Sequence, residues 1–107
     1  MFTRIVECPA KKGKTEELAQ KIRTDLLPTL QKQPGFIDLI ALKGNKDDER
    51  IVCLSFWNSK ESAERHQRQH YDDIVQMLRA ELETNPTLET LQVELSTAHR
   101  IASSRAA

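Results

Sequence analysis

Alternation of apolar and polar residues predicts four β-strands in this chain. Residues 2–8 form the first strand, closed by Pro9, and residues 36–42 and 50–57 form the next two. The polar, turn-prone residues 44–49 predict that the second and third strands form a hairpin. Leu91, Val93 and Leu95 alternate with polar residues and predict a fourth strand.

Two segments between these strands have the period of an amphipathic helix. The first begins near Thr15, an expected N-cap, and its apolar residues recur every four positions: Leu18, Ile22, Leu26 and Leu30. Pro28 should kink this helix near residues 24–27, because proline removes one hydrogen bond and crowds the preceding turn. The second helix is capped by Asn58 or Ser59 and runs towards Glu83, with an inward stripe of Ala63, His66, His70, Ile74 and Leu78.

The resulting βαββαβ order is that of a ferredoxin-like α+β sandwich, one antiparallel four-stranded sheet with two helices on one face. Apolar residues occupy both faces of the middle strands: Phe36, Ile40 and Leu42 oppose Ile37, Leu39 and Ala41, and Val52, Leu54 and Phe56 oppose Ile51, Cys53 and Trp57. Two helices can cover one face only, and burying each large apolar side chain on the other is worth ~1.5–3 kcal/mol. We therefore expect a symmetric homodimer packed through the sheet face.

Length and charge narrow the possible functions. The 107 residues fit one domain, expected over residues 1–101, followed by a flexible tail at residues 102–107. Sixteen basic residues balance sixteen acidic ones, whereas proteins that bind nucleic acid through its phosphates carry a basic excess. No apolar run approaches the ~20 residues that span a bilayer, and Arg4 and Glu7 interrupt the first segment, where a secretory signal would be apolar. We expect a cytoplasmic protein that binds neither nucleic acid nor membrane.

Cys8 and Cys53 both fall in apolar, strand-like segments. Two cysteines do not make a disulfide framework. A reduced thiol in such a position behaves as a small hydrophobe, so two core cysteines are favoured over a redox pair, although neighbouring antiparallel strands could bring the thiols close.

His66 and His70 are the main candidates for chemistry, since they lie four apart and share one helix face. This spacing suits a metal, but no glutamate base lies between them. The possible third ligands are Glu7, Cys53 and His99, so no metal is expected. The two histidines are interpreted either as a structural pair or as the lining of a pocket that holds a polar substrate group.

Trp57 and Tyr71 flank these histidines in the predicted fold. Trp57 ends the third strand, where a packing anchor is favoured over a ligand-stacking role. Tyr71 could extend its hydroxyl to solvent or into a pocket. The lysines at positions 11, 12 and 14 are interpreted as a solvated loop.

Several short motifs together resemble the antibiotic biosynthesis monooxygenase family of dimeric α/β barrels. They are Lys12-Gly13-Lys14 before the first helix, Gln33-Pro34-Gly35-Phe36 at the second strand, Phe56-Trp57-Asn58-Ser59-Lys60-Glu61-Ser62 at the strand-to-helix junction, and His66 followed by His70-Tyr71. The similarity extends from Phe2 to about Leu95. The resemblance implies a ferredoxin-like subunit that pairs through its sheet and has a cavity between helices and sheet.

Enzymes of this family oxidise polycyclic phenols or quinols with O₂, typically without metal or flavin, and one branch degrades haem. The resemblance thus implies a monooxygenase without cofactors that acts on a quinol-like or phenolic substrate. Such a reaction needs a substrate that ionises, a dry pocket and a polar group that takes the proton. His66 and His70 would be the catalytic residues, and Trp57, Tyr71 and Cys53 the substrate-binding residues.

The chain departs from the family pattern at several of these positions. The haem-degrading branch has an asparagine where this chain has Val6 and Glu7, a tryptophan at His66 and a haem-ligating histidine at Gln76, so haem degradation is not expected. Polyketide-oxidising members have an asparagine where this chain has Cys53.

Two other functions are compatible with the sequence: a non-catalytic dimeric barrel that binds an apolar or aromatic metabolite, and a regulatory interaction module, which the neutral charge disfavours. A cavity of ~300 Å³ or more lined by His66, His70 and Trp57 would support an enzyme or a binding protein, and a solid core would contradict both.

Overall fold

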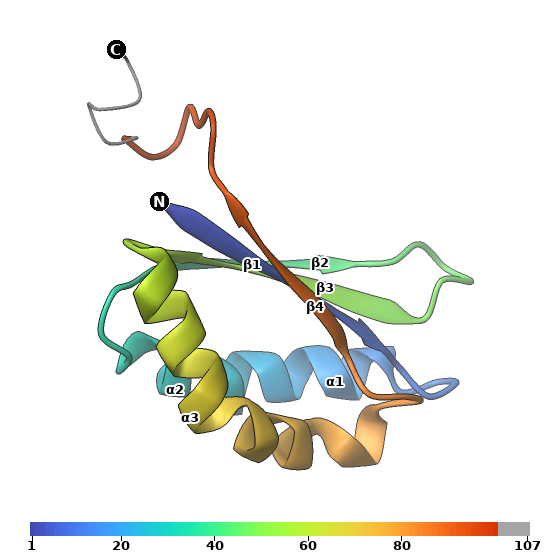
Figure 1. Cartoon of the computed structure of the whole chain (residues 1–107). Helices are drawn as coiled ribbons and strands as arrows, with labels where there is room; N and C mark the ends of the chain where they lie inside the picture. Colours follow the sequence, from blue (N-terminus) through green and yellow to red (C-terminus); the bar gives the residue numbers. More distant parts are fainter. Residues whose placement is uncertain (101–107) are drawn as a thin grey trace.

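The structure, a computed structural model, describes residues 1–100, and these form a four-stranded antiparallel sheet with helices on one face (Figure 1). The strands β1 (Phe2–Pro9), β2 (Phe36–Lys43), β3 (Arg50–Trp57) and β4 (Thr87–Gln92) lie in the order β2-β3-β1-β4. This architecture confirms the predicted ferredoxin-like fold. The tail expected at residues 102–107 lies outside the described residues. No helix within residues 1–100 has the length and apolarity required to cross a membrane.

Two helical segments cover the sheet. The first, between β1 and β2, comprises α1 (Thr15–Lys21), a π-helical turn (Ile22–Leu26) and α2 (Leu27–Gln31). The second, between β3 and β4, comprises α3 (Lys60–Leu78) and a 3₁₀ turn (Arg79–Glu81). Both segments lie below the sheet in Figure 1, so its upper face is left without helical cover.

The strict alternation of β3 separates the two faces of the sheet. Ile51, Cys53, Ser55 and Trp57 are buried on the side of the helices, here termed the inner face. Val52, Leu54 and Phe56 point to the opposite side, the outer face, and are half-buried. The same alternation in β1 places Arg4, Val6 and Cys8 on the inner face.

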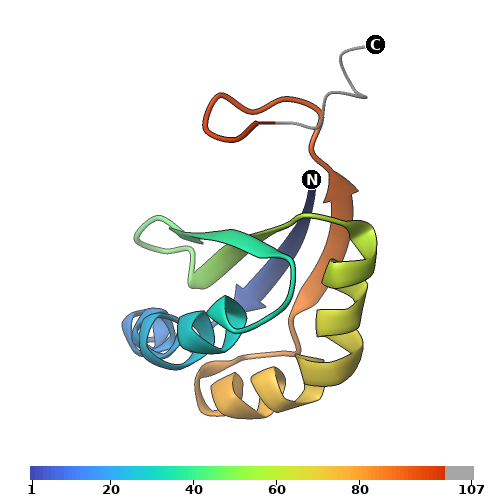
Figure 2. The same cartoon turned by 90° about the vertical axis from the view of Figure 1, so that its left-hand side faces the viewer.

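The outer face carries apolar side chains from all four strands: Ile5, Ile40, Leu42, Val52, Leu54, Phe56 and Leu91. Ile40, Leu42 and Leu91 remain 42%, 49% and 49% exposed. The segment that follows β4 curls over one end of this face (Figure 2), where the His99 ring lies 5.4 Å from that of Phe56. The structure thus confirms that large apolar side chains remain on the face without helices, while the dimer itself stays a prediction.

A β-bulge makes the start of β2 differ from the prediction. Phe36 pairs with Trp57 and Asp38 with Phe56, so the register shifts by one residue between them. This extra residue reverses the alternation and places Phe36 on the inner face, with its ring edge-to-face against Trp57 at 5.6 Å. The predicted grouping of Phe36 with Ile40 and Leu42 is therefore wrong.

Pro28 disturbs the first helical segment at the predicted place. The π-helical turn at Ile22–Leu26 ends two residues before Pro28. Proline has no N–H to donate to the carbonyl of Thr24, and the wider turn accommodates the loss. The predicted N-cap is wrong, because Thr15 is the first helical residue and Lys14 precedes it without a side-chain capping bond.

The second helical segment and the last strand also end differently from the prediction. Ser59 caps α3 and its hydroxyl accepts a hydrogen bond from the Ser62 N–H at 3.1 Å. The α-helix ends at Leu78, before the predicted limit at Glu83. β4 pairs Gln92 with Phe2, the first residue of β1, so Val93 and Leu95 lie beyond the partner strand.

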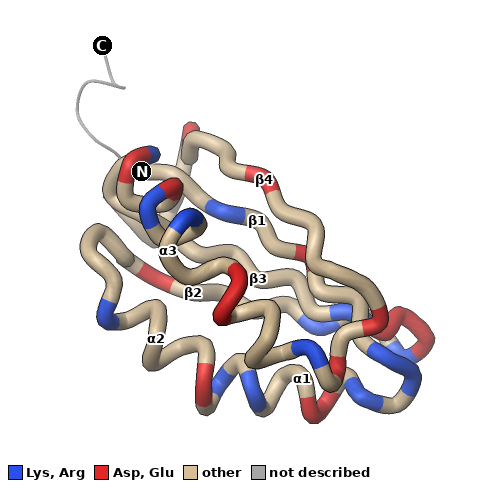
Figure 3. The backbone as a smooth tube through the Cα atoms, turned by 60° about the horizontal axis from the view of Figure 1, so that its bottom comes forward, with Lys and Arg blue, Asp and Glu red and all other residues tan. Residues whose placement is uncertain are grey.

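Basic and acidic residues are interspersed along the backbone of residues 1–100 (Figure 3). Several form ion pairs along the helices, including Lys14 with Glu17 and Lys60 with Glu64. This distribution agrees with the formal net charge of zero.

Replacing Gly35 should destabilise the fold more than replacing Gly13. Both glycines have a positive φ, +84° and +77°, which costs an alanine ~1–3 kcal/mol. A Cβ at Gly35 would also lie 2.5 Å from the Ser62 Cβ, whereas a Cβ at Gly13 meets no atom within 4 Å. Urea unfolding of G35A and G13A should show the larger loss in G35A. Equal losses would contradict close packing of this turn on the start of α3.

Candidate functional site

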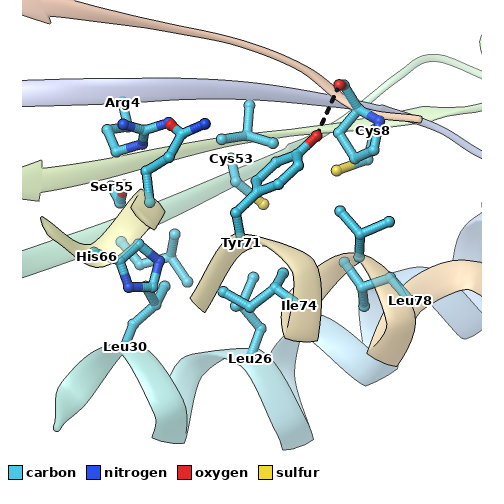
Figure 4. Close-up of a pocket in the computed structure, with 15 residues that line it drawn as sticks. Arg4, Cys8, Leu26, Leu30, Cys53, Ser55, His66, Tyr71, Ile74 and Leu78 are labelled. Atoms are coloured by element: carbon cyan, nitrogen blue, oxygen red, sulfur yellow. Dashed lines mark hydrogen bonds between the residues drawn. The ribbon is translucent and has the colours of Figure 1, made fainter. Parts of the chain in front are cut away.

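A cavity of about 60 Å³ lies between the inner face of the sheet, α2 and α3 (Figure 4). Its lining includes five polar residues: Arg4, Ser55, His66, Gln67 and Tyr71. Figure 4 places Arg4, Ser55 and His66 at one end and Cys8 and Leu78 at the other, so the cavity has a polar end and an apolar end. An apolar cavity that binds benzene measures ~150 Å³. The cavity is therefore much smaller than the ~300 Å³ expected, and of the three expected lining residues it contains His66 alone.

Trp57 supports the cavity without lining it. The residue is fully buried, and its Nε1–H donates a hydrogen bond to the Ser55 Oγ at 2.9 Å. Its ring stacks on that of His66 with the centroids 5.0 Å apart. This position is that of a packing anchor, which holds the His66 imidazole against the cavity.

His66 is a buried polar residue at the polar end of the cavity. It is 8% exposed, and its Nδ1 makes no hydrogen bond within the described residues. Burial, the neighbouring His70 and the Arg4 charge lower the pKa of His66 to about 4. The imidazole is therefore neutral at pH 7, with one ring nitrogen able to donate a hydrogen bond and the other to accept one.

His70 and Tyr71 are consecutive residues of α3 and have different surroundings. The His70 ring stacks on that of His66 at 5.5 Å, is partly exposed and does not line the cavity. Tyr71 lines the cavity, and its hydroxyl donates one long hydrogen bond of 3.4 Å to the Pro86 carbonyl. The structure thus brings the two histidines together and places Tyr71 in the lining of the cavity.

Cys8 and Cys53 lie on the adjacent strands β1 and β3, and both line the cavity. Burial raises the pKa of Cys53 to about 12 and that of Cys8 to about 11, so both thiols are protonated at neutral pH. Both are free and buried. This confirms the interpretation as core cysteines and leaves Cys53 in the place proposed for substrate contact.

Of the three candidate third metal ligands, Cys53 lies on the same side of the sheet as the histidine pair and lines the cavity with His66. Glu7 and His99 lie on the outer face, where Glu7 pairs with Arg50 and His99 with Asp38. Within residues 1–100, no three side chains of the His, Cys, Asp and Glu types are close enough to hold a metal ion together.

Arg4, Ser55 and Gln67 are polar lining residues that sequence reasoning missed, and Arg4 is the charged one among them. It is 5% exposed, and its Nη1 donates hydrogen bonds to the Ala63 carbonyl at 3.5 Å and to the Thr90 Oγ1 at 3.3 Å. The alternation of Phe2, Arg4, Val6 and Cys8 in one strand places a cation on the apolar side. This alternation is the feature of the sequence that could have identified Arg4 as a residue of the inner face.

Solved structures with this fold include several oxygenases. The chain is similar to a protein of unknown function from Nitrosomonas europaea (18% identity, TM-score 0.75, 90% of this chain and 91% of that chain covered). It is also similar to SnoaB, a cofactor-independent oxygenase from Streptomyces nogalater (16%, TM-score 0.74, 92% and 97%), and to the ActVA-Orf6 monooxygenase of Streptomyces coelicolor, solved with nanaomycin D (14%, TM-score 0.71, 86% and 86%). None of the curated proteins matches the sequence. The family described as "Antibiotic biosynthesis monooxygenase" matches residues 1–77, and the chain belongs to this family.

Proposed function

We propose that this protein is a cofactor-independent monooxygenase that oxidises a phenolic or quinol-like small molecule with O₂. The observation that carries the proposal is the buried Nδ1 of His66, which has no partner within the described residues and lies at the polar end of an otherwise largely apolar cavity. A buried polar group without a partner costs ~1–3 kcal/mol, which a substrate oxygen would recover. Membership of the family and the oxygenases that share the fold support this chemistry.

The proposed reaction needs no external reductant. The ionised phenol donates electrons from a ring carbon to O₂, and the new C–O bond carries a hydroperoxide. Loss of water from this hydroperoxide leaves a quinone carbonyl. One phenol and one O₂ thus give one quinone and one water, with four electrons moving from the substrate to oxygen. The residues must hold the anion in a dry pocket while this happens.

His66 is better suited to donate a hydrogen bond than to take the phenol proton. A phenol has a pKa of ~10 and the pKa of His66 is about 4, so the transfer would be uphill by ~8 kcal/mol at 1.36 kcal/mol per unit. A neutral imidazole N–H can instead stabilise the charge on the substrate oxygen. His70, which stacks on His66 and is partly exposed to solvent, is the histidine near the cavity that can transfer the proton, since His99 lies on the outer face.

The cavity must enlarge to admit such a substrate. Its volume of about 60 Å³ is less than half that of an apolar cavity of ~150 Å³ that binds benzene. Tyr71 is partly exposed and held by one long hydrogen bond, so its displacement would cost little. Rotation of Tyr71 away from Pro86 would open the cavity beside His66.

The proposed working unit is a homodimer that buries the outer face against a second copy. Seven apolar side chains lie on this face, and three of them are 42–49% exposed. Each contributes ~1.5–3 kcal/mol when fully buried. Two outer faces packed together would supply the cover that the helices do not provide.

A non-catalytic protein that binds a small apolar or aromatic molecule is the second candidate. The small size of the cavity and its largely apolar lining favour it. Oxygen consumption separates the two candidates, since a binding protein consumes none.

Removing the His66 imidazole should abolish most oxygen consumption. With a hydroquinone panel, H66A should lower kcat by ~10²–10³, the usual loss of one hydrogen bond to developing charge. H70A should lower kcat as well, if His70 transfers the proton. The exposed residue Gln69, one position before His70, provides the control Q69A. Far-UV circular dichroism checks the fold, because Trp57 stacks on His66 and its fluorescence would change with the substitution itself. Wild-type rates in both histidine variants would contradict the site.

His66 should remain neutral down to acidic pH. Proton NMR of the imidazole C2–H is expected to show one histidine that titrates near pH 4 in the wild type and disappears in H66Q. Removing the neighbouring His70 charge in H70A should raise this midpoint. Because the unfolded chain binds this proton near the ordinary histidine pKa, wild-type stability should fall as the pH drops towards 4, and less so in H66Q. A His66 midpoint near 6.5 would contradict the proposed neutral role.

A charge among the apolar side chains of the outer face should dissociate the dimer. Ile40 is 42% exposed and pairs with Leu54, so I40K would place an unpaired ammonium in the interface. Light scattering after size exclusion should give a dimer for the wild type and a monomer for I40K. The matched control is Q69K, which adds the same charge on the exposed side of α3. A monomeric wild type would contradict the proposed dimer.

A further inference from the structure

The buried guanidinium of Arg4 lacks an anionic partner. Arg4 lies on β1 and faces α3, and its two hydrogen bonds go to the neutral oxygens of Ala63 and Thr90 at 3.5 and 3.3 Å. Charge-assisted bonds of this kind are normally ~2.7–2.9 Å. No ion pair joins Arg4 to a carboxylate within residues 1–100. A buried cation without an anionic partner destabilises the folded protein, and an anion bound beside it would remove this penalty.

The carboxylate whose charge acts on Arg4, that of Glu64, does not neutralise the guanidinium. Glu64 on α3 acts on Arg4 through its charge, but its side chain is 46% exposed and lies 3.8 Å from the Lys60 ammonium. Solvent and Lys60 therefore weaken its effect on Arg4.

The other titratable groups around the cavity are also unsuited to pair with Arg4 at neutral pH. On β1 and β3, burial keeps the thiols of Cys8 and Cys53 protonated. On α3, His70 stacks on His66, and Tyr71 uses its hydroxyl as a donor to the Pro86 carbonyl. Leu30 of α2 and Leu26 of the preceding turn also line the cavity, and their side chains carry no charge that could pair with Arg4.

A second observation at the same end of the cavity also indicates a missing ligand. His66 has a buried nitrogen without a partner within the described residues, and Figure 4 places it close to Arg4 and Ser55. A cation and a neutral imidazole that both face a cavity match a ligand oxygen that carries negative charge. A neutral phenol would leave the Arg4 charge uncompensated.

We infer that Arg4 binds the ionised oxygen of the substrate, and that the protein selects acidic phenols or enols, which enter as anions. This inference rests on the proposed function for the phenolic nature of the ligand. Binding a pre-formed anion removes the need for a strong base in the site. Arg4 then decides which phenols are substrates, while His66 donates a hydrogen bond to the same oxygen.

The test is an anaerobic titration with 4-nitrophenol, which ionises near neutral pH and absorbs in the visible only as the anion. Bound to the wild type, it should ionise ~1–3 pH units lower than in solution, the usual effect of a cation at ~4–6 Å. R4Q should lose this shift, and R4K should keep most of it. 4-Nitroanisole has the same shape without an ionisable oxygen, and its affinity should be the same in the wild type and R4Q.

Three results would overturn the inference: no binding of 4-nitrophenol to the wild type, an unshifted midpoint for the bound form, or equal loss of both probes in R4Q. If R4Q fails to fold, the wild-type midpoint decides, with R4K as the second variant. Because oxygen is absent, a shifted midpoint would support the anion site even if no phenol is oxidised. Oxygen consumption with an unshifted midpoint would leave the proposed function in place and remove the role of Arg4.

Discussion

Both helical segments pack against the same face of the sheet, and this one-sided cover determines the remaining features of the molecule. Between the inner face and the helices, Leu18, Trp57 and Leu78 are completely or almost completely removed from solvent. On the outer face, Ile40 and Leu42 remain about half exposed. Because apolar burial is the main stabilising contribution to a small domain, the bare face is the reason for the proposed dimer. The cavity, in contrast, lies on the inner face.

The cavity combines a stable support with polar groups that the fold itself leaves unsatisfied. Trp57 is fixed by its hydrogen bond to Ser55 and by the ring of Phe36, and it holds His66 by stacking. Arg4 and His66 are then buried without the partners that such groups normally have in a protein interior. Groups of this kind reduce stability and are retained at functional sites, where a ligand completes their hydrogen bonds.

Much of the fold could be predicted from periodicity, and the errors lie where one local event changes the pattern. The bulge between Phe36 and Asp38 moved Phe36 to the inner face, and the end of β1 at Phe2 fixed the end of β4 at Gln92. For the site, sequence reasoning identified His66, Tyr71 and Cys53, which line the cavity, together with His70 and Trp57, which contact His66 from outside it. It missed Arg4, because one charged residue in a strand is usually assigned to the solvent side.

The sequence by itself determined the order of strands and helices, the excess of apolar residues on two faces and the proximity of the two histidines. These properties depend on neighbours within a few positions, where the periods of helix and strand apply. Tertiary structure alone decided that Trp57 lies behind His66, that the cavity is small, and that Arg4 meets α3 and β4 without an acid. Such facts arise from residues as far apart as Arg4 and Thr90, whose contact depends on how all four strands pair and on which side the helices pack.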